Sequence, residues 1–298
     1  MVKGIDKLIM CRPHEMPDKY YRYDSEQDEY FKENGRRPSG YQSMNKAGKY
    51  GIHRPIDSVN KIRPLVNKWR DGKPKYSGTS NITKKLLSHW RYRDEARLFF
   101  CQLEAIETII FASENPDIDK LIKNDKGDFN RYCTKMATGT GKTIVMGMLI
   151  AYHILNSGKN YAKDILVLTP NLTVKHRLQV LLPSNPNNIY QEFDLVPAHL
   201  LNKLSSANIR ITNFHQLKPK TSKTSSVAKL GTQSPKSFTK SILGYNASNI
   251  LVINDEGHHA WRPSEYNNKT KEAEEAGLWT SGLDIICLLY TSPSPRDS

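Results

Sequence analysis

The chain has few cysteines and no long hydrophobic run, and each shortage excludes a class of protein. Only 4 of the 298 residues are cysteine, and none form a C-x-x-C pair, so neither a disulfide framework nor a zinc site is predicted. No apolar stretch approaches the roughly 18 residues of a membrane span, and no signal-peptide pattern opens the chain. With 38% hydrophobic residues the chain can still bury a substantial core. We therefore expect a folded, cytoplasmic protein without membrane contact.

Acidic residues are scarce relative to basic ones. The chain has 44 Lys and Arg against 30 Asp and Glu, a net charge of +14, and residues 1–100 hold 22 of the basic and 12 of the acidic side chains. Such a chain is predisposed to bind a polyanion, of which nucleic acid is the commonest. A solvated basic surface is the alternative, and charge alone does not decide between them.

The first 95 residues show little periodicity. Helices are expected only around 59–69 and 82–90, the second with Ser80 or Asn81 as N-cap. Between residues 20 and 50, basic residues are interleaved with six tyrosines, Tyr20, Tyr21, Tyr23, Tyr30, Tyr41 and Tyr50. These rings could stack on bases or pack in a small core of their own, and both alternatives stay open. We assign residues 1–95 as an irregular, basic accessory region.

From Arg97 onward, apolar residues recur at the spacing of a buried helix. Gln102 lies early in this helix, and its side-chain amide carries both the donor and the acceptor that an adenine edge requires. An ordinary polar helix position is the alternative. The helix opens the predicted core domain, 96–286.

The clearest motif is Met136–Thr143, which reads Met-Ala-Thr-Gly-Thr-Gly-Lys-Thr. It follows a run at 131–135 that we predict as a strand and precedes the apolar run 144–155, predicted as a helix. Backbone N–H groups and the helix N-terminus can cradle phosphates, Lys142 can reach the terminal phosphates, and the Thr143 hydroxyl can hold Mg²⁺. The predicted cradle consists of Ala137, Thr138, Gly139, Thr140, Gly141, Lys142 and Thr143.

Three further apolar runs, at 164–169, 208–213 and 249–254, alternate with helical segments. Nearly all-apolar strands separated by helices imply an α/β fold, with a parallel sheet covered by helices on both faces. Ligand sites in such sheets lie at the carboxyl ends of the strands. The residues at or directly after these ends are Thr169, Pro170, Asn171, Thr212, Asn213, Asp255 and Glu256.

Two other stretches lack such patterns. Residues 218–240 are rich in Lys, Ser and Thr and contain no acid, so they are predicted as a flexible surface insertion. Residues 257–282 are expected to be irregular, apart from an acidic helical patch at 271–276.

Asp255 and Glu256 directly follow the last apolar run. Phosphoryl transfer needs an acidic element at a neighbouring strand end, which holds Mg²⁺ and orients the attacking water. We expect Asp255 to hold the metal, Glu256 to orient the water and Lys142 to complete the catalytic set. Outside this setting an Asp-Glu pair is usually a surface turn. His258 has no ligand partner at metal-site spacing, and we expect it to couple the nucleotide site to the rest of the protein.

These motifs resemble those in the first motor domain of superfamily 2 helicases of the DEAD/DEAH type, and more narrowly those of the helicase-type subunits of type III restriction enzymes. The matching segments are 137–143 for motif I, 169–171 for motif Ia, 212–213 for the following DNA-contact element, 255–258 for motif II and 99–106 for the segment in which Gln102 would meet adenine. The chain lacks the glycine that the general phosphate-loop pattern has at Met136, and the helicase form begins at Ala137 instead. Gly257 replaces the alanine of the common Asp-Glu-Ala-His motif.

The resemblance implies a RecA-like P-loop NTPase domain over 96–286, and an ATP- and Mg²⁺-dependent DNA translocase or helicase of a restriction system. Its implied partners are double-stranded DNA and a methyltransferase (modification) subunit. It assigns DNA contacts to Thr169, Pro170, Asn171, Thr212 and Asn213. Two alternatives remain: a repair, remodelling or RNA helicase motor without a nuclease, and a nucleotide-gated DNA-binding module.

The last residues resemble something else. Residues 287–297 resemble the translation of a transposase-based sequencing adapter, so we expect 287–298 to be a non-native tail. The natural chain is then expected to continue beyond Ile286 into a second motor domain. With half of the cleft missing, the fragment is expected to bind ATP weakly and to hydrolyse it poorly.

Overall fold

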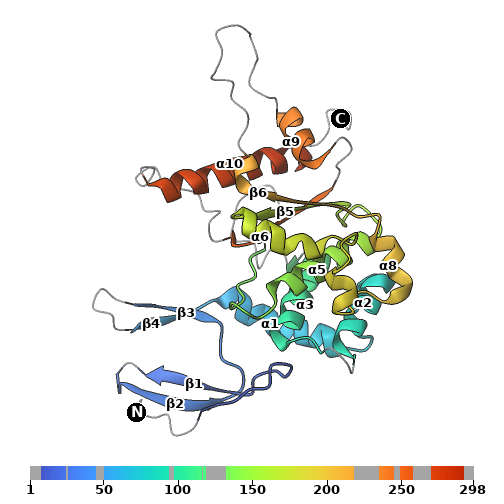
Figure 1. Cartoon of the computed structure of the whole chain (residues 1–298). Coiled ribbons are helices and arrows are strands. Elements are labelled where there is room, and N and C mark those ends of the chain that lie inside the picture. Colours follow the sequence, from blue (N-terminus) through green and yellow to red (C-terminus); the bar gives the residue numbers. More distant parts are fainter. Residues whose placement is uncertain are drawn as a thin grey trace. The chain divides into compact units, whose positions relative to one another are not determined.

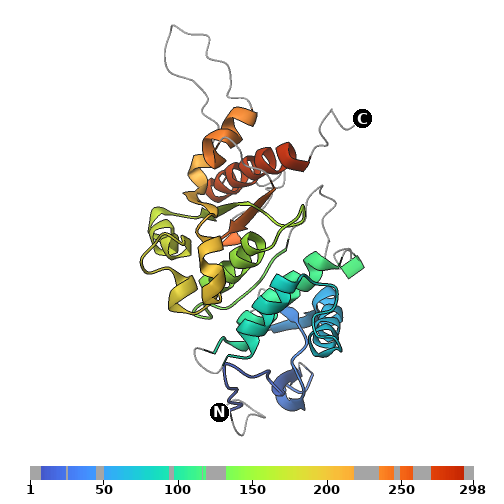
Figure 2. The same ribbon diagram turned by 90° about the vertical axis from the view of Figure 1, so that its right-hand side faces the viewer.

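A computed structural model describes residues 8–24, 26–44, 50–93, 97–115, 117–118, 132–217, 235–244, 249–257 and 270–291. The chain divides into two compact units (Figures 1 and 2), Met1–Asp125 with Thr134–Lys142 and Lys126–Cys133 with Thr143–Ser298. The domain boundary at 95/96 stays a prediction. None of the described helices combines the length and the apolarity of a membrane span.

The first unit opens with two antiparallel hairpins, where the sequence indicates no regular structure. β1 (Lys19–Asp24) pairs with β2 (Glu29–Asn34), and β3 (Gly40–Met44) pairs with β4 (Tyr50–Pro55). β1 and β2 mix tyrosines with charged residues on both faces, and β3 and β4 contain few apolar residues, so the apolar alternation that marks a half-buried strand is absent. The expectation of an irregular region is wrong for these four segments.

Three helices complete the first unit: α1 (Asp57–Asp71), α2 (Asn81–Arg91) and α3 (Phe100–Glu114). They confirm the three helices predicted here, and Ser80 caps α2 by accepting a hydrogen bond from the Thr83 N–H at 3.0 Å. Aromatic rings fill the core between these helices, since the Trp69 ring lies 4.9 Å from Tyr76 and 5.2 Å from Phe111.

The second unit is built on a parallel sheet with the order β6-β5-β7. β5 (Asp164–Thr169) is the central strand and is buried along its whole length. β6 (Asn208–Asn213) and β7 (Ile250–Asn254) pair with it on either side. Full burial of the central strand explains its nearly continuous apolar sequence. The three strands at these positions and their parallel direction are confirmed.

Helices cover both faces of this sheet (Figure 1). α9 (Pro235–Leu243) and α10 (Lys271–Thr291) lie on one face, and α5 (Lys142–Leu155) and α6 (Leu172–Arg177) lie on the other. On the α10 side, buried side chains of β5, η2 and α10 form one apolar cluster that includes Leu166, Leu168, Phe214, Leu217 and Trp279. The remaining short helices are η1 (Leu178–Leu181), α7 (Ile189–Glu192), α8 (Ala198–Leu204) and η2 (Phe214–Leu217). The predicted α/β fold is thereby confirmed.

The prediction of a strand at 131–135, before the phosphate loop, is wrong. Residues 132–137, which include most of that segment, have no regular secondary structure. Cys133, Thr134 and Lys135 are exposed. A strand inside a parallel sheet needs a continuous apolar character that this polar run does not have.

Two expectations of irregular structure are also wrong. α10 is one helix of 21 residues that continues well beyond 276 and includes residues 287–291, the start of the predicted tail. α9 covers 235–240 of the predicted insertion, whereas 218–234 lie outside the described residues. The buried residues of α10 include Ala273, Ala276, Trp279 and Ile286, and polar residues stand between them in the sequence.

Candidate nucleotide-binding site and sheet edge

The phosphate loop forms a tight turn before α5. The backbone N–H and the hydroxyl of Thr140 both donate to the Ala137 carbonyl, at 3.4 and 2.6 Å. Gly139 and Gly141 have φ angles of 80° and 78°, a left-handed conformation that residues with a side chain rarely adopt. Ala137 therefore begins the turn and the two glycines shape it. Thr138 and Gly139 are exposed at its tip, where a phosphate can approach.

Gln102 contacts this loop directly. Its side-chain N–H donates to the Thr140 carbonyl at 2.9 Å, and its carbonyl oxygen accepts from the Phe99 N–H at 2.9 Å. One amide N–H and one oxygen lone pair remain by count, but the residue is only 3% exposed. The side chain thus joins the start of α3 to the loop, while its contact with adenine stays a prediction.

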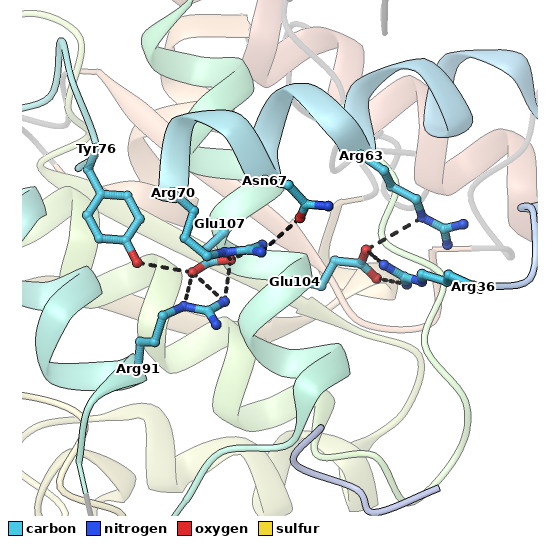
Figure 3. A network of polar contacts seen from close by, with 8 residues as sticks. All are labelled: Arg36, Arg63, Asn67, Arg70, Tyr76, Arg91, Glu104 and Glu107. Carbon is cyan, nitrogen blue, oxygen red and sulfur yellow. Dashed lines mark hydrogen bonds and ion pairs between the residues drawn. The ribbon is translucent and has the colours of Figure 1, made fainter. Parts of the chain in front are cut away.

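A buried polar network holds α3 in place (Figure 3). The Glu107 carboxylate, 1% exposed, accepts hydrogen bonds from Arg70 on α1 at 2.8 Å, from Arg91 on α2 at 2.8 Å and from the Tyr76 hydroxyl at 3.3 Å. Arg70 also donates to Asn67 at 2.8 Å. One carboxylate on α3 therefore ties together the two preceding helices.

Arg91 and Tyr76 keep their protons in this network, which favours their hydrogen bonds to Glu107. Burial alone would lower the pKa of Arg91, but the charge and hydrogen bonds of Glu107 outweigh burial and raise it. Burial, followed by the charge of Glu107, raises the pKa of Tyr76. Both side chains therefore remain donors to the carboxylate.

A second carboxylate on α3, Glu104, pairs with arginines from elsewhere in the first unit (Figure 3). Arg36 forms a bidentate pair with it, and the Arg63 Nε lies 3.5 Å from its Oε1. The Arg36 guanidinium also lies over the Phe100 ring, 4.9 Å from the ring centroid. Glu104 and Glu107 lie one helical turn apart, so α3 is fixed at two points just after Gln102.

The second unit brings the predicted strand-end residues together at one edge of the sheet. Thr169 pairs with Asn213 across β5 and β6, and Leu168 pairs with Asn254 across β5 and β7. Asn213 donates from its side chain to the Pro170 carbonyl at 3.2 Å, and the Thr169 hydroxyl lies 3.3 Å from the Thr212 carbonyl. We call this group, residues 169–171, 212–213 and 255–256, the sheet edge.

Most of the predicted DNA contacts at the sheet edge are buried. Thr169, Thr212 and Asn213 are 0%, 7% and 6% exposed, and their polar groups hydrogen bond within the protein. Asn171 is exposed and caps α6 by accepting from the Val174 N–H at 2.9 Å. The buried residues shape the edge, and a DNA contact through Asn171 stays a prediction.

Asp255 and Glu256 extend from β7 at the same edge. The Asp255 N–H donates to the Leu168 carbonyl at 3.0 Å, which continues the strand pairing by one residue. The Asp255 side chain is 4% exposed, and Arg177 on α6 lies 4.0 Å from its Oδ2. Glu256 has a φ of 57°, a strained conformation for a residue with a side chain and one that clusters at functional sites.

The residues present fit a bound Mg²⁺. Asp255 is a nearly buried carboxylate at the end of a sheet strand, where positive charge stabilises its ionised form. Thr143 and Asp255 are oxygen ligands, which Mg²⁺ prefers, and phosphates and water usually complete its shell. In the described part of the chain, no three His, Cys, Asp or Glu side chains form a metal cluster. Thr143 and Asp255 would therefore be the protein ligands.

Gly257 departs from the common motif without a steric need for glycine. Its φ is not left-handed, and an added Cβ would lie 3.8 Å from the Asn254 Cβ, an ordinary contact. The alanine of the common motif would therefore fit. The next residue, His258, lies outside the described residues, so its coupling role stays a prediction.

The sequence analysis missed several residues that support the site. The Trp279 indole N–H on α10 donates to the Asn254 side chain at 3.1 Å, directly before Asp255. Arg177 and Trp279 lie far from Asp255 in the sequence, and no local signal marks either. Glu107 does carry a weak signal, because it is an acid that stands among apolar residues of a largely apolar helix sequence.

The comparisons with known proteins agree with the fold and the motifs. Residues 95–278 match the family model described as type III restriction enzyme, res subunit. A search of curated proteins and a search of solved structures gave no match. The matched region includes the phosphate loop and the whole sheet edge, and the domain of this family has a RecA-like P-loop fold of the helicase type. Because the match covers more than half of the chain, the protein belongs to the type III restriction enzyme res subunit family.

Proposed function

We propose that the chain is the ATP-dependent DNA translocase or helicase motor of a restriction system. The observation that carries this proposal is the sheet edge, where the acidic pair Asp255 and Glu256 follows β7 beside Thr169 at the end of the central strand, and Asn213 ends β6 on the other side of that strand. In open parallel sheets this edge is the position of the ligand site.

Each residue has a chemical task in the proposed reaction. Lys142 binds the terminal phosphates, and the turn at Gly139 and Gly141 presents backbone N–H groups to them. Glu256 orients the attacking water and accepts its proton. When Mg²⁺ is bound by Thr143 and Asp255, it neutralises charge on the phosphates.

The proposed partner of the motor is double-stranded DNA, with a methyltransferase subunit as a further partner. The net charge of +14 supports a polyanionic partner, and Asn171 is an exposed polar group at the sheet edge. Residues 169–171 and 212–213 form the proposed DNA-contact elements. Residues 169–171 lie at the end of the strand next to the acidic pair, and 212–213 end the strand beyond it, so DNA bound there would lie at the same edge as the proposed site of hydrolysis.

Nucleotide binding tests the phosphate loop. We expect Lys142→Ala to weaken Mg²⁺-ATP binding by at least about tenfold, measured by titration calorimetry. The substitution removes the positive charge that contacts the terminal phosphates. Lys135→Ala is the matched control, since Lys135 is an exposed lysine just before the loop. Equal ATP affinity in the wild type and Lys142→Ala would contradict the proposal.

Single-turnover phosphate release, with protein in excess over ATP, tests the acidic pair. We expect Glu256→Gln to bind ATP like the wild type but to release phosphate at least about 100-fold more slowly, because it lacks the proton acceptor. Release at the wild-type rate would remove Glu256 from the mechanism.

A further inference from the structure

We propose that one face of the β1–β2 hairpin binds single-stranded DNA. This inference rests on the proposed function, because a motor that acts on duplex DNA generates or meets unpaired strands. We call this surface the Lys-Tyr face, and it consists of Lys19, Tyr21, Tyr23, Tyr30, Lys32 and Asn34.

The strand register defines this face. In an antiparallel ribbon, directly paired residues point to the same side and successive residues point to opposite sides. The pairs Lys19 with Asn34, Tyr21 with Lys32 and Tyr23 with Tyr30 therefore share one face. The alternate pairs, on the opposite face, are Tyr20 with Glu33, Arg22 with Phe31 and Asp24 with Glu29.

Charge is segregated between the two faces. The strand residues of the Lys-Tyr face include two lysines and no carboxylate, whereas the opposite face has three carboxylates and one arginine. That arginine, Arg22, is already paired, at 3.1 Å from Glu33 and 3.2 Å from Asp24. A polyanion is attracted to the first face and repelled by the second.

The rings of the Lys-Tyr face are held in position. Tyr23 and Tyr30 have their centroids 5.0 Å apart at an interplanar angle of 50°, and the Tyr23 hydroxyl donates to Asp28 in the turn at 2.6 Å. The tyrosines are partly exposed, and Lys32 is exposed directly opposite Tyr21. A phosphate contact therefore lies beside a ring that can stack on the attached base.

These features favour an unpaired strand over a duplex. Tyrosine rings can stack only on bases that are not paired in a helix, whereas duplex reading uses side chains such as Arg, Asn and Gln at base edges. Asn34 is the single side chain of that kind on this face. Among the described helices and strands, the most extensive contacts of β1 and β2 are with each other.

The test compares the two faces with matched variants of the full chain. Binding of a fluorescein-labelled 15-mer of deoxythymidine is measured by anisotropy without ATP. Tyr21→Leu and Lys32→Ala remove a tyrosine and a basic side chain from the Lys-Tyr face. Tyr20→Leu and Arg22→Ala remove a tyrosine and a basic side chain from the opposite face. We expect the first two to weaken binding at least about fivefold, which is the effect of losing a stack or a phosphate contact, and the other two to change it less than twofold.

A second measurement keeps the test valid if a variant disturbs the hairpin. The wild-type chain is photocrosslinked to the same oligonucleotide carrying 5-bromodeoxyuridine, and the attached peptides are identified by mass spectrometry. We expect crosslinks at Tyr21 or Tyr30. Crosslinks confined to other parts of the chain would overturn the proposal, as would equal losses from both faces.

Competition and one active-site variant complete the design. Unlabelled single-stranded DNA should displace the probe at lower concentration than duplex DNA or single-stranded RNA of the same length, and the reverse order would refute single-stranded DNA as the occupant. Glu256→Gln should bind the probe like the wild type. Phosphate release at the wild-type rate in that variant would contradict the proposed motor, whereas equal losses of probe binding from both hairpin faces would contradict the single-stranded DNA site. The two proposals can therefore fail separately.

Discussion

Glu107 is a buried acid on α3, and its carboxylate is the common partner of Arg70, Arg91 and Tyr76. Glu107→Gln would leave two largely buried guanidinium groups without their counter-charge. We expect this change to lower the free energy of unfolding by about 3 to 5 kcal/mol, because breaking a buried ion pair from one side leaves an uncompensated charge. Urea unfolding followed by circular dichroism measures it.

Glu15→Gln is the matched control for this change. Glu15 pairs with Arg12 at 3.2 Å, but both side chains are mostly exposed, so the pair contributes little. We expect its unfolding midpoint to equal that of the wild type. If the two variants were equally stable, the network would not hold α3.

His153 makes the free energy of unfolding fall as the pH falls. It is partly buried on α5, its Nδ1 accepts from the Ala162 N–H at 3.0 Å, and desolvation lowers its pKa to about 4. Between pH 6.5 and 4 the unfolded chain binds a proton on this residue that the folded chain does not, so acidification through this range destabilises the fold. The contribution is fully present above pH 6.5 and amounts to up to about 3 kcal/mol.

His153→Asn isolates this contribution, because asparagine keeps an acceptor for the Ala162 N–H but does not titrate. We expect the wild type to lose more stability than the variant between pH 7 and pH 4.5, measured by urea unfolding at both values. Parallel losses in the two proteins would show that His153 is protonated in the folded state as readily as in the unfolded one.

At the scale of the elements, α10 approaches η2 so closely that only a glycine fits between them. A Cβ added at Gly282 would lie 2.5 Å from the Leu217 Cβ and 3.0 Å from its carbonyl oxygen. Gly282→Ala must therefore push the helix away from the sheet. We expect a loss of about 1 to 3 kcal/mol, as for other overpacked cores, and lower thermal stability by circular dichroism.

Gly147 on α5 provides the comparison. A Cβ there would lie 2.4 Å from the Ile189 Cδ1, the tip of a flexible side chain that can rotate away. We expect Gly147→Ala to be less destabilising than Gly282→Ala, helped by the better helix propensity of alanine. The opposite order would mean that α7 is more rigidly held than α10.

The elements differ in how far the sequence could predict them. β5 and β7 were predictable because their apolar residues are continuous, β6 because it is rich in β-branched residues, and the phosphate loop because its glycines and lysine have fixed spacing. The β1–β2 hairpin was not, since neither of its faces is apolar. The helix from 277 onward was missed because its buried residues, such as Trp279, are separated by polar ones. The partners of Glu107 lie 37 and 16 residues away, and no local pattern connects them.

For the whole molecule, the net charge of +14 predicts how binding responds to salt. We expect the affinity for a 20-base-pair duplex to fall steeply between 50 and 200 mM salt, by about a thousandfold if about six phosphates are contacted. Fluorescence anisotropy at a series of salt concentrations measures the slope. An affinity that does not change with salt would mean that the basic side chains form only a solvated surface.

Because β5 pairs with a strand on each side, insertions and deletions are tolerated unequally along the chain. β5 is bonded to β6 at Thr169 and Asn213 and to β7 at Leu168 and Asn254. Loss of one residue within β5 would reverse the direction of its side chains beyond the deletion and shift its register against both neighbours at the sheet edge. Extra residues at 183–187, between η1 and α7, would leave all three strands aligned. Related chains should therefore vary in length between η1 and α7, whereas the length of β5 should stay constant.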